Sequence, residues 1–270
     1  MLLSYREDFD TAIVLDKFTW GSAKELNLEQ PLEFKGKGIS LLQHQDKFHV
    51  KVTQKQFLAN SEPGRVKKGR IQEGPPLSTA KLRSVTGTLQ WLAGQTRPEL
   101  AAWVSLANKG KKDTGPAELA QLYATLDYAR ENSEAGLVLQ DVAINKATTV
   151  VGYADSSWAN AAQCASQQGC LVLLTTPHCT QVITKGNLVD WRSNRSSRVC
   201  RSTLAAESIA CDDCVDRSHY TSLVLAKILT AKPYHKDPEK WKLQQFQVTD
   251  CRSLFDAVTR EPPRSALTWT

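Results

Sequence analysis

The chain has 270 residues, of which 41% are hydrophobic and 23% charged, close to the averages of globular proteins. These values exclude a disordered, collagen-like or coiled-coil protein, and no run of about 18 apolar residues is present to span a membrane. The N-terminal sequence MLLSYREDFD becomes charged too early for a secretory signal peptide. We therefore expect a soluble intracellular protein, in the cytoplasm or the nucleus. The net charge of +6 is compatible with a nucleic-acid partner but does not require one.

The first half of the chain predicts a β-hairpin followed by helices. Strand-forming residues flank a polar turn, in the segments 38–42 and 48–52. Residues 60–76 are rich in Pro, Gly, Lys and Arg, which favours a basic loop. Apolar residues at helical spacing, and a Thr-Arg-Pro-Glu helix start, predict helices over 78–93, from 96 onward and over 117–131.

The second half predicts a mixed sheet of the α/β class. Three strands with short connections favour an antiparallel meander, over 148–155, 170–175 and 187–192. A long helix over 202–230 then separates them from a fourth strand, 244–250, and a helix that begins at 252. Because the long helix acts as a crossover, we expect the fourth strand to run parallel to one of the first three, with helices on the faces of the sheet.

Two acidic residues stand at the C-terminal ends of predicted strands. Asp155 ends the first strand and Asp250 the fourth, so parallel pairing brings both carboxylates to one edge of the sheet. Glu207 lies within two turns of the start of the long helix and can reach the same edge. Clustered carboxylates repel one another, and a hard divalent cation such as Mg²⁺ relieves that repulsion. The alternative is that Asp155 and Asp250 are polar strand ends and Glu207 a solvated helix residue.

Five motifs in this half resemble the ribonuclease H domain of copia-type LTR retrotransposon Pol polyproteins. In chain order they are GYADSSWAN (152–160), QQGCLVLL (167–174), VDWRSNRSSRV (189–199), RSTLAAES (201–208) and VTDCRSLFDAV (248–258). The resemblance implies a ribonuclease H-like fold and a metal-dependent endonuclease that hydrolyses the RNA strand of RNA–DNA hybrids. It assigns Asp155, Glu207 and Asp250 as catalytic residues and as ligands of Mg²⁺, with Mn²⁺ as the alternative metal.

The first half resembles the C-terminal part of the reverse transcriptase from the same polyprotein. The matching segments are FKGKGISLLQHQDKFHVKVTQKQF (34–57), LRSVTGTLQWLAGQTRPELAAWVSLANK (82–109) and LDYARENSEAGLVL (126–139). The resemblance implies an α+β remnant of reverse transcriptase, thumb- or connection-like, over residues 1–140. A C-terminally truncated ribonuclease H-like domain then occupies residues 147–270, and other parts of a Pol polyprotein become candidate partners.

The chain departs from this family at two points. No Tyr-x-Asp-Asp tetrad occurs, so we expect no polymerase activity. The family's fourth carboxylate has no match, because Asp256 and Glu261 do not stand in its final motif. A second hypothesis is therefore a catalytically inactive, nucleic-acid-binding remnant of a decayed retroelement. A third is a host protein that reuses the fold for protein interaction.

A basic run separates the third strand from the helix of Glu207. It contains Arg192, Arg195, Arg198 and Arg201, with Ser196 among them. Arginine matches the geometry of phosphate oxygens, and a serine hydroxyl can donate to them, so we expect this run to bind the backbone of an RNA–DNA hybrid. A solvated basic loop is the alternative. Trp158, close to Asp155, is expected to be a packing anchor rather than a substrate contact.

Overall fold

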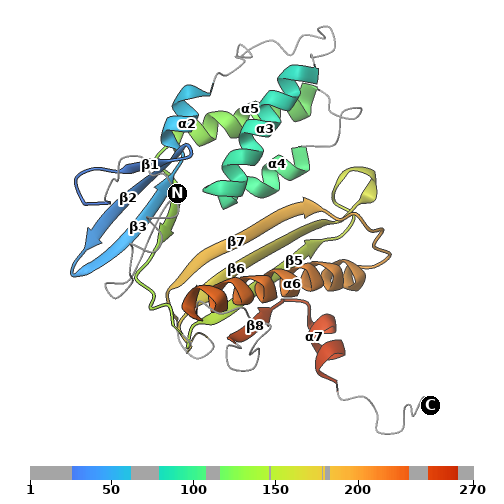
Figure 1. The fold of residues 1–270 in the computed structure, drawn as a ribbon. Helices are drawn as coiled ribbons and strands as arrows, with labels where there is room; N and C mark the ends of the chain where they lie inside the picture. The colour runs from blue at the N-terminus through green and yellow to red at the C-terminus, as the bar shows by residue number, and fades with distance from the viewer. Residues whose placement is uncertain are drawn as a thin grey trace.

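A computed structural model of the chain describes residues 26–61, 79–107, 116–145, 147–177, 179, 183–230 and 243–260. These residues form two four-stranded sheets and a group of helices, which in chain order lies between the third and fourth strands of the first sheet (Figure 1). The first sheet and the helices come mainly from the N-terminal half. The second sheet and the long helix that crosses it come from the C-terminal half. The predicted basic loop over 60–76 falls almost entirely outside the described residues.

The first sheet is antiparallel throughout and has the order β1-β2-β3-β4. Its strands are β1 (Leu32–Phe34), β2 (Lys37–His44), β3 (Lys47–Thr53) and β4 (Gly136–Leu139). The predicted hairpin is confirmed, with Gly38 opposite Thr53 and His44 opposite Lys47. The sequence did not predict β1 or the short helix α2 (Lys55–Asn60), because three and six residues are too few to establish a hydrophobic period.

The helical group packs around its own apolar core. It consists of α3 (Thr79–Gln95), the short 3₁₀ helix η1 (Pro98–Leu100), α4 (Ala101–Ala107) and α5 (Pro116–Glu131). The three predicted helices are confirmed within about three residues at each end. Their core includes the buried side chains of Leu89, Leu92, Leu100, Leu122 and Leu126.

A buried arginine fastens this group where η1 meets α5. Arg97 is only 1% exposed, and its guanidinium donates to the backbone oxygens of Ala129 and Asn132 at 3.3 and 3.0 Å. These carbonyls lie at and just beyond the C-terminal end of α5, where backbone oxygens lack helical partners and a cation is favoured. Glu99 pairs with the same guanidinium, so the buried charge is compensated.

The second sheet is mixed and has the order β7-β6-β5-β8. Its strands are β5 (Thr149–Ser157), β6 (Gln167–Thr175), β7 (Gly186–Arg195) and β8 (Gln244–Val248). The expected antiparallel meander and the parallel fourth strand are both confirmed. The predicted ends need correction: β5 continues two residues past Asp155, and β8 stops two residues before Asp250.

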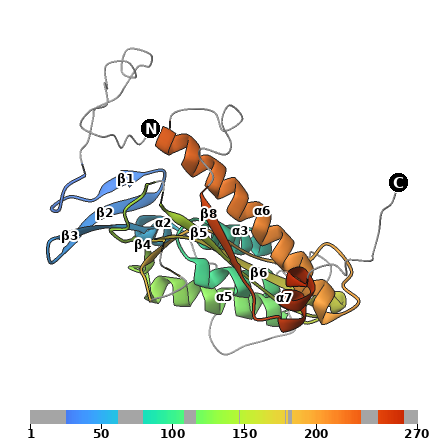
Figure 2. The same cartoon turned by 90° about the horizontal axis from the view of Figure 1, so that it is seen from below.

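The long helix α6 (Thr203–Thr230) lies across this sheet, and α7 (Arg252–Thr259) follows β8 (Figures 1 and 2). Cys214 and Leu225 of α6 pack with Val150, Val172 and other apolar side chains of the strands to form a second core. Among the described residues, no helix combines the length and the apolarity that a membrane crossing requires.

α6 packs tightly against β5 at Gly152. A Cβ atom at this position would lie 2.3 Å from Oε1 of Gln247, 2.6 Å from Oγ of Ser218 and 2.8 Å from Sγ of Cys214. Real Cβ atoms essentially never come this close to another heavy atom. Glycine is therefore required here for the helix to rest on the strand.

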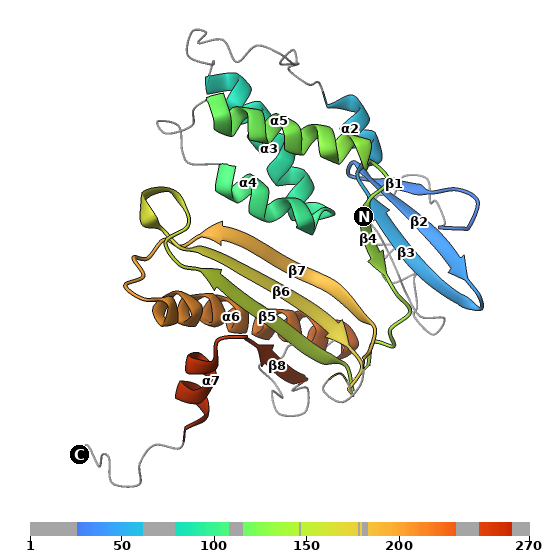
Figure 3. The same cartoon turned by 180° about the vertical axis from the view of Figure 1, so that it is seen from behind.

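The helical group contacts the second sheet along its edge strand β7, as Figure 3 shows from behind. The indole N–H of Trp191 donates to the backbone oxygen of Ala93 at 2.6 Å. The amide nitrogen of Gln167 donates to both Ser105 and Ser193 at 2.9 Å. The domain boundary expected between residues 140 and 147 falls in the segment that joins β4 to β5.

Replacing Gly152 with alanine should lower the free energy of unfolding by about 1–3 kcal/mol, because the added methyl group overpacks the contact between α6 and β5. Gly169→Ala is the matched control: a Cβ at this glycine of β6 would meet its nearest atom at 3.8 Å, an ordinary contact. Urea unfolding of the two variants measures the difference. Equal stability would contradict the close approach at Gly152.

Candidate metal centre

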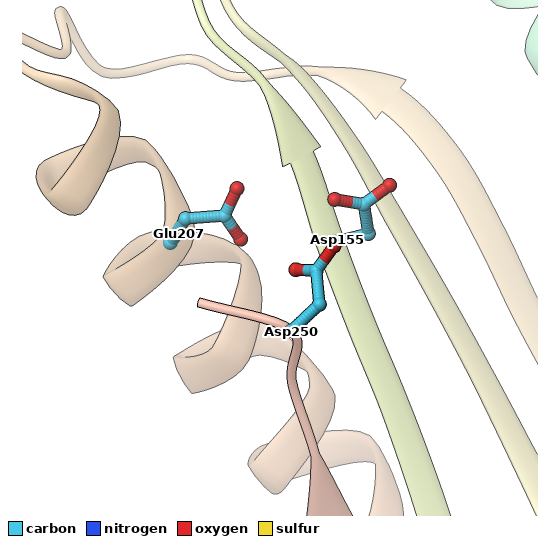
Figure 4. Close-up of side chains that lie close together, drawn as sticks. All are labelled: Asp155, Glu207 and Asp250. Atoms are coloured by element: carbon cyan, nitrogen blue, oxygen red, sulfur yellow. The ribbon is translucent and has the colours of Figure 1, made fainter. Parts of the chain in front are cut away.

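Three carboxylates meet at one end of the second sheet. Asp155 comes from β5, Glu207 from the second turn of α6 and Asp250 from the segment after β8 (Figure 4). One oxygen from each of the three lies within 4.8 Å of the others. Among the described residues, this is the one group of acidic, histidine or cysteine side chains with the spacing of a metal site.

Strand pairing explains why the two aspartates meet. β8 pairs in parallel with β5, with Gln244 opposite Thr149 and Val248 opposite Tyr153. Two residues beyond this last pair, Asp155 lies within β5 and Asp250 lies in the segment that follows β8, so the two acids arrive at the same edge. This is the juxtaposition that the sequence predicted, although Asp155 lies inside its strand rather than at the end of it.

Glu207 contributes the buried member of the group. Its side chain is 5% exposed, and its Oε2 has no hydrogen-bond partner within the part of the chain that the structure describes. Burial is the main cause that raises the pKa of this carboxyl, and the charges of Asp155 and Asp250 raise it further. Ser156 lies close enough to favour the charged form in part, although its hydroxyl does not reach hydrogen-bonding geometry with Glu207.

The donor set matches the preference of a hard divalent cation. Mg²⁺ and similar ions take oxygen ligands, and three carboxylates supply these together with the negative charge that such an ion neutralises. The unpartnered oxygen of Glu207 is a buried acceptor for which a cation is the natural partner. The cluster therefore fits a divalent metal ion that prefers oxygen ligands.

The other two acids considered from the sequence do not join this group. Asp256 lies on α7 and forms an ion pair with Arg252, with 2.9 Å between Oδ1 and Nε. Glu261 lies outside the described residues.

The basic run divides into engaged and free side chains. The guanidinium of Arg192 donates to Asp213 of α6 at 3.3 Å. Ser196 is buried, at 6% exposed, and its hydroxyl accepts a hydrogen bond from the backbone N–H of Arg198 at 3.2 Å. The guanidinium groups of three arginines form no ion pair within the described part of the chain: Arg195, Arg198 and Arg201. These three are exposed and remain available to an anionic partner.

Trp158 connects the two elements that carry Asp155 and Glu207. Its indole N–H donates to the backbone oxygen of Cys200 at 2.9 Å, which ties the end of β5 to the loop before α6. The sequence predicted Trp158 as a packing anchor, but the residue is 48% exposed, so the hydrogen bond rather than burial holds it. The sequence did not predict the role of Gly152, whose absent side chain lets α6 approach the strand. A glycine inside an otherwise apolar strand was the available signal.

The secreted RxLR effector protein 161 of Plasmopara viticola is 29% identical over 128 residues, which are 47% of this chain and 81% of that protein. No protein family and no solved structure matches the chain.

Glu207→Gln should stabilise the metal-free protein at neutral pH. Folding raises the pKa of Glu207, so the folded state binds the carboxyl proton more tightly than the unfolded state does. As far as Glu207 is concerned, the wild type is therefore most stable below the ordinary pKa of a glutamate, and it loses stability as the pH rises from there through the raised pKa of the folded state. Glutamine has no proton to lose. Thermal unfolding in a chelator, from acidic to neutral pH, should show the smaller decline for the variant.

Added Mg²⁺ should reverse this order, because a bound cation stabilises the folded wild type and binds the variant more weakly. Glu131→Gln, which changes an exposed acid on α5, is the control and should follow the wild type in both conditions. A wild-type melting temperature that does not respond to Mg²⁺ or Mn²⁺ would contradict the metal site.

Proposed function

We propose that this chain is a metal-dependent endonuclease that hydrolyses the RNA strand of RNA–DNA hybrids, as the ribonuclease H part of a copia-type retrotransposon Pol polyprotein. The observation that carries the proposal is the meeting of Asp155, Glu207 and Asp250 within 4.8 Å, from three separate parts of the chain. These are the three residues that the family resemblance assigned to the metals. The mixed sheet with a crossover helix is compatible with a ribonuclease H-like fold.

The three acids would hold the metal, and each has a distinct position. Glu207 is fixed by burial on α6, whereas Asp155 and Asp250 are exposed and open to a substrate. When bound, Mg²⁺ supplies positive charge to the phosphodiester and lowers the pKa of water. The exposed aspartates therefore form the side of the site that a scissile phosphate would approach.

The free arginines support a nucleic-acid substrate. Arg195 ends β7, and Arg198 and Arg201 lie in the loop that leads to α6 and Glu207. Contacts between arginine and phosphate position a duplex without reading its sequence. The choice of an RNA–DNA hybrid rests on the resemblance, and 2′-hydroxyl groups in the wide minor groove would distinguish the RNA strand.

The N-terminal half supports the Pol assignment less directly. Its matched segments fold as a β-hairpin and a helical group that packs against the second sheet. We propose that it is the C-terminal remnant of the reverse transcriptase. A polymerase function is not proposed, because the chain contains no Tyr-x-Asp-Asp tetrad.

A second candidate is a catalytically inactive, nucleic-acid-binding remnant. One observation favours it: the described acid nearest in sequence after Asp250 is Asp256, and Arg252 engages its carboxylate. The cluster then contains three acids, where the family resemblance implies four. Under this hypothesis the protein retains the fold and the hybrid-binding arginines but does not cleave.

Cleavage of a labelled RNA–DNA hybrid by the purified chain, with Mg²⁺ and separately with Mn²⁺, decides between the two candidates. We expect RNA-strand products that disappear in Asp155→Asn, because this change removes a metal ligand on the substrate side. Asp256→Asn is the matched control and should retain activity. Hybrid binding without cleavage in either metal would support the inactive remnant.

Arg198→Ala and Arg201→Ala should each weaken hybrid binding and reduce the slope of log affinity against log salt by about one, because each change removes one phosphate contact. Arg192→Ala is the comparison variant, and its slope should equal that of the wild type because Asp213 already engages this guanidinium. Fluorescence anisotropy over a salt series measures all three. Slopes that do not differ would show that the loop does not contact phosphate.

A further inference from the structure

A cleft of about 390 Å³ lies between the helical group and the edge strand of the second sheet. α3 and α4 form one wall and β7 forms the other. The cleft, hereafter the α3–β7 cleft, is lined by residues that include Gln90, Gly94, Ser105, Trp191, Ser193 and Arg195. Its volume lies in the range of small-ligand sites, about 300–1,000 Å³.

The lining combines an aromatic ring with free polar groups. Trp191 is held in place by the hydrogen bond from its indole N–H to Ala93, so its ring is ordered without a ligand. The guanidinium of Arg195 and the amide of Gln90 have no hydrogen bond or ion pair within the described residues. An aromatic ring for stacking and a free arginine, four residues apart along β7 and both lining the cleft, are groups that bind single-stranded nucleic acid.

Gln167 of β6 provides a second link between the walls of the cleft, in addition to the bond from Trp191 to Ala93. Gln167 is 7% exposed, and its nitrogen donates to Ser105 on α4 and to Ser193 on β7. A cleft of about 390 Å³ has the size of a small-ligand site, which is too small to hold a double helix. The occupant is therefore smaller than a double helix.

The cleft opens on the same face of the sheet as Asp155. Asp155 pairs with Gly169, and Gly169 pairs with Ser193, so the three form one row, and directly paired residues project to the same face. Two strand spacings, about 10 Å, separate Asp155 from Ser193. Gly169 places no side chain between them.

We propose that the α3–β7 cleft binds one unpaired nucleotide, with its base on Trp191 and its phosphate at Arg195. The nucleotide belongs to a nucleic-acid strand that continues over Gly169 towards the carboxylates. The proposal that a nucleotide binds here depends only on the lining of the cleft. The continuation to a cleaved phosphate rests on the proposed nuclease function.

Gly94→Leu tests the proposal by filling the cleft from α3. A Cβ at Gly94 meets no atom within 4 Å, and leucine favours a helix more than glycine does, so the variant should fold. Gly87→Leu is the matched control. Gly87 lies on the same helix, about two turns earlier on the same side, also has open space at its Cβ, and does not line the cleft.

The measurement is fluorescence anisotropy of a short labelled single-stranded DNA with the full chain, in chelator and without metal. Loss of one stacked base should weaken binding at least about fivefold in Gly94→Leu, and Gly87→Leu should match the wild type. Arg195→Ala should weaken binding and lower the salt slope by about one. Equal affinity of the wild type, Gly94→Leu and Gly87→Leu would overturn the proposal.

Competition separates the two sources of a nucleotide. Unlabelled single-stranded DNA should displace the probe, whereas displacement by adenosine monophosphate at equal nucleotide concentration would show a site for free nucleotides and overturn the strand assignment. Because the assay contains no metal, it does not depend on hydrolysis. If the wild type binds the probe through the cleft but cleaves no hybrid, the nucleotide site in the cleft is supported and the proposed nuclease function is refuted.

Discussion

The close approach of α6 to β5 at Gly152 determines the geometry of the second sheet and its carboxylates. Because this position has no side chain, Ser218 and Cys214 pack directly against the strand, and the thiol of Cys214 contacts the backbone oxygen of Tyr153 at 3.5 Å. Glu207 precedes Cys214 by about two helical turns and so lies on the same side of α6. The contact that seats the helix therefore also aims Glu207 at the end of the sheet where Asp155 and Asp250 meet.

A second contact fixes the direction of α6. Arg217 donates to Asp190 of β7 at 2.6 Å and to Asp213 of its own helix at 3.4 Å, and Arg192 of β7 also reaches Asp213. Isolated surface ion pairs contribute little, but this one links two arginines and two aspartates across the helix and the strand. Together with Gly152, it holds α6 to the centre and to the edge of the sheet.

β7 links the two halves of the molecule through alternate side chains. Asp190 and Arg192 bind α6, whereas Trp191 between them binds the backbone of α3. Successive side chains of a strand point to opposite faces, so one strand can serve both partners. The helical group is thereby attached to the same sheet that carries Asp155, and the cleft between them has a fixed aromatic wall.

The sequence predicted those features of the fold that depend on the local hydrophobic period and on the order of the strands along the chain. The hairpin, the four strands of the second sheet and the crossover α6 follow from hydrophobic patterns and connection lengths, and the meeting of Asp155 with Asp250 follows from parallel pairing. Contacts between distant positions gave no local signal. The bond from Trp191 to Ala93, the bridge made by Gln167 and the burial of Arg97 each depend on a partner that no short segment contains.

The same limit explains the basic run. Spacing alone treated its four arginines as equivalent, yet Asp213 engages Arg192, and the hydroxyl of Ser196 serves the backbone of its own loop. Which cations remain free depends on the tertiary contacts of α6. The three free arginines lie at the end of β7 and along the loop that leads to Glu207, which concentrates positive charge beside the cluster of acids.

The energetics of Glu207 bear on whether the site is in use. Without a cation, the folded protein keeps a carboxylate that is buried, lacks a partner for one oxygen and faces two further acids. Burial and repulsion both oppose its charged form, so this arrangement lowers the stability of the folded state at neutral pH. A bound divalent cation removes the repulsion and supplies the missing partner. The three acids therefore favour a protein that binds a divalent cation at this end of the sheet.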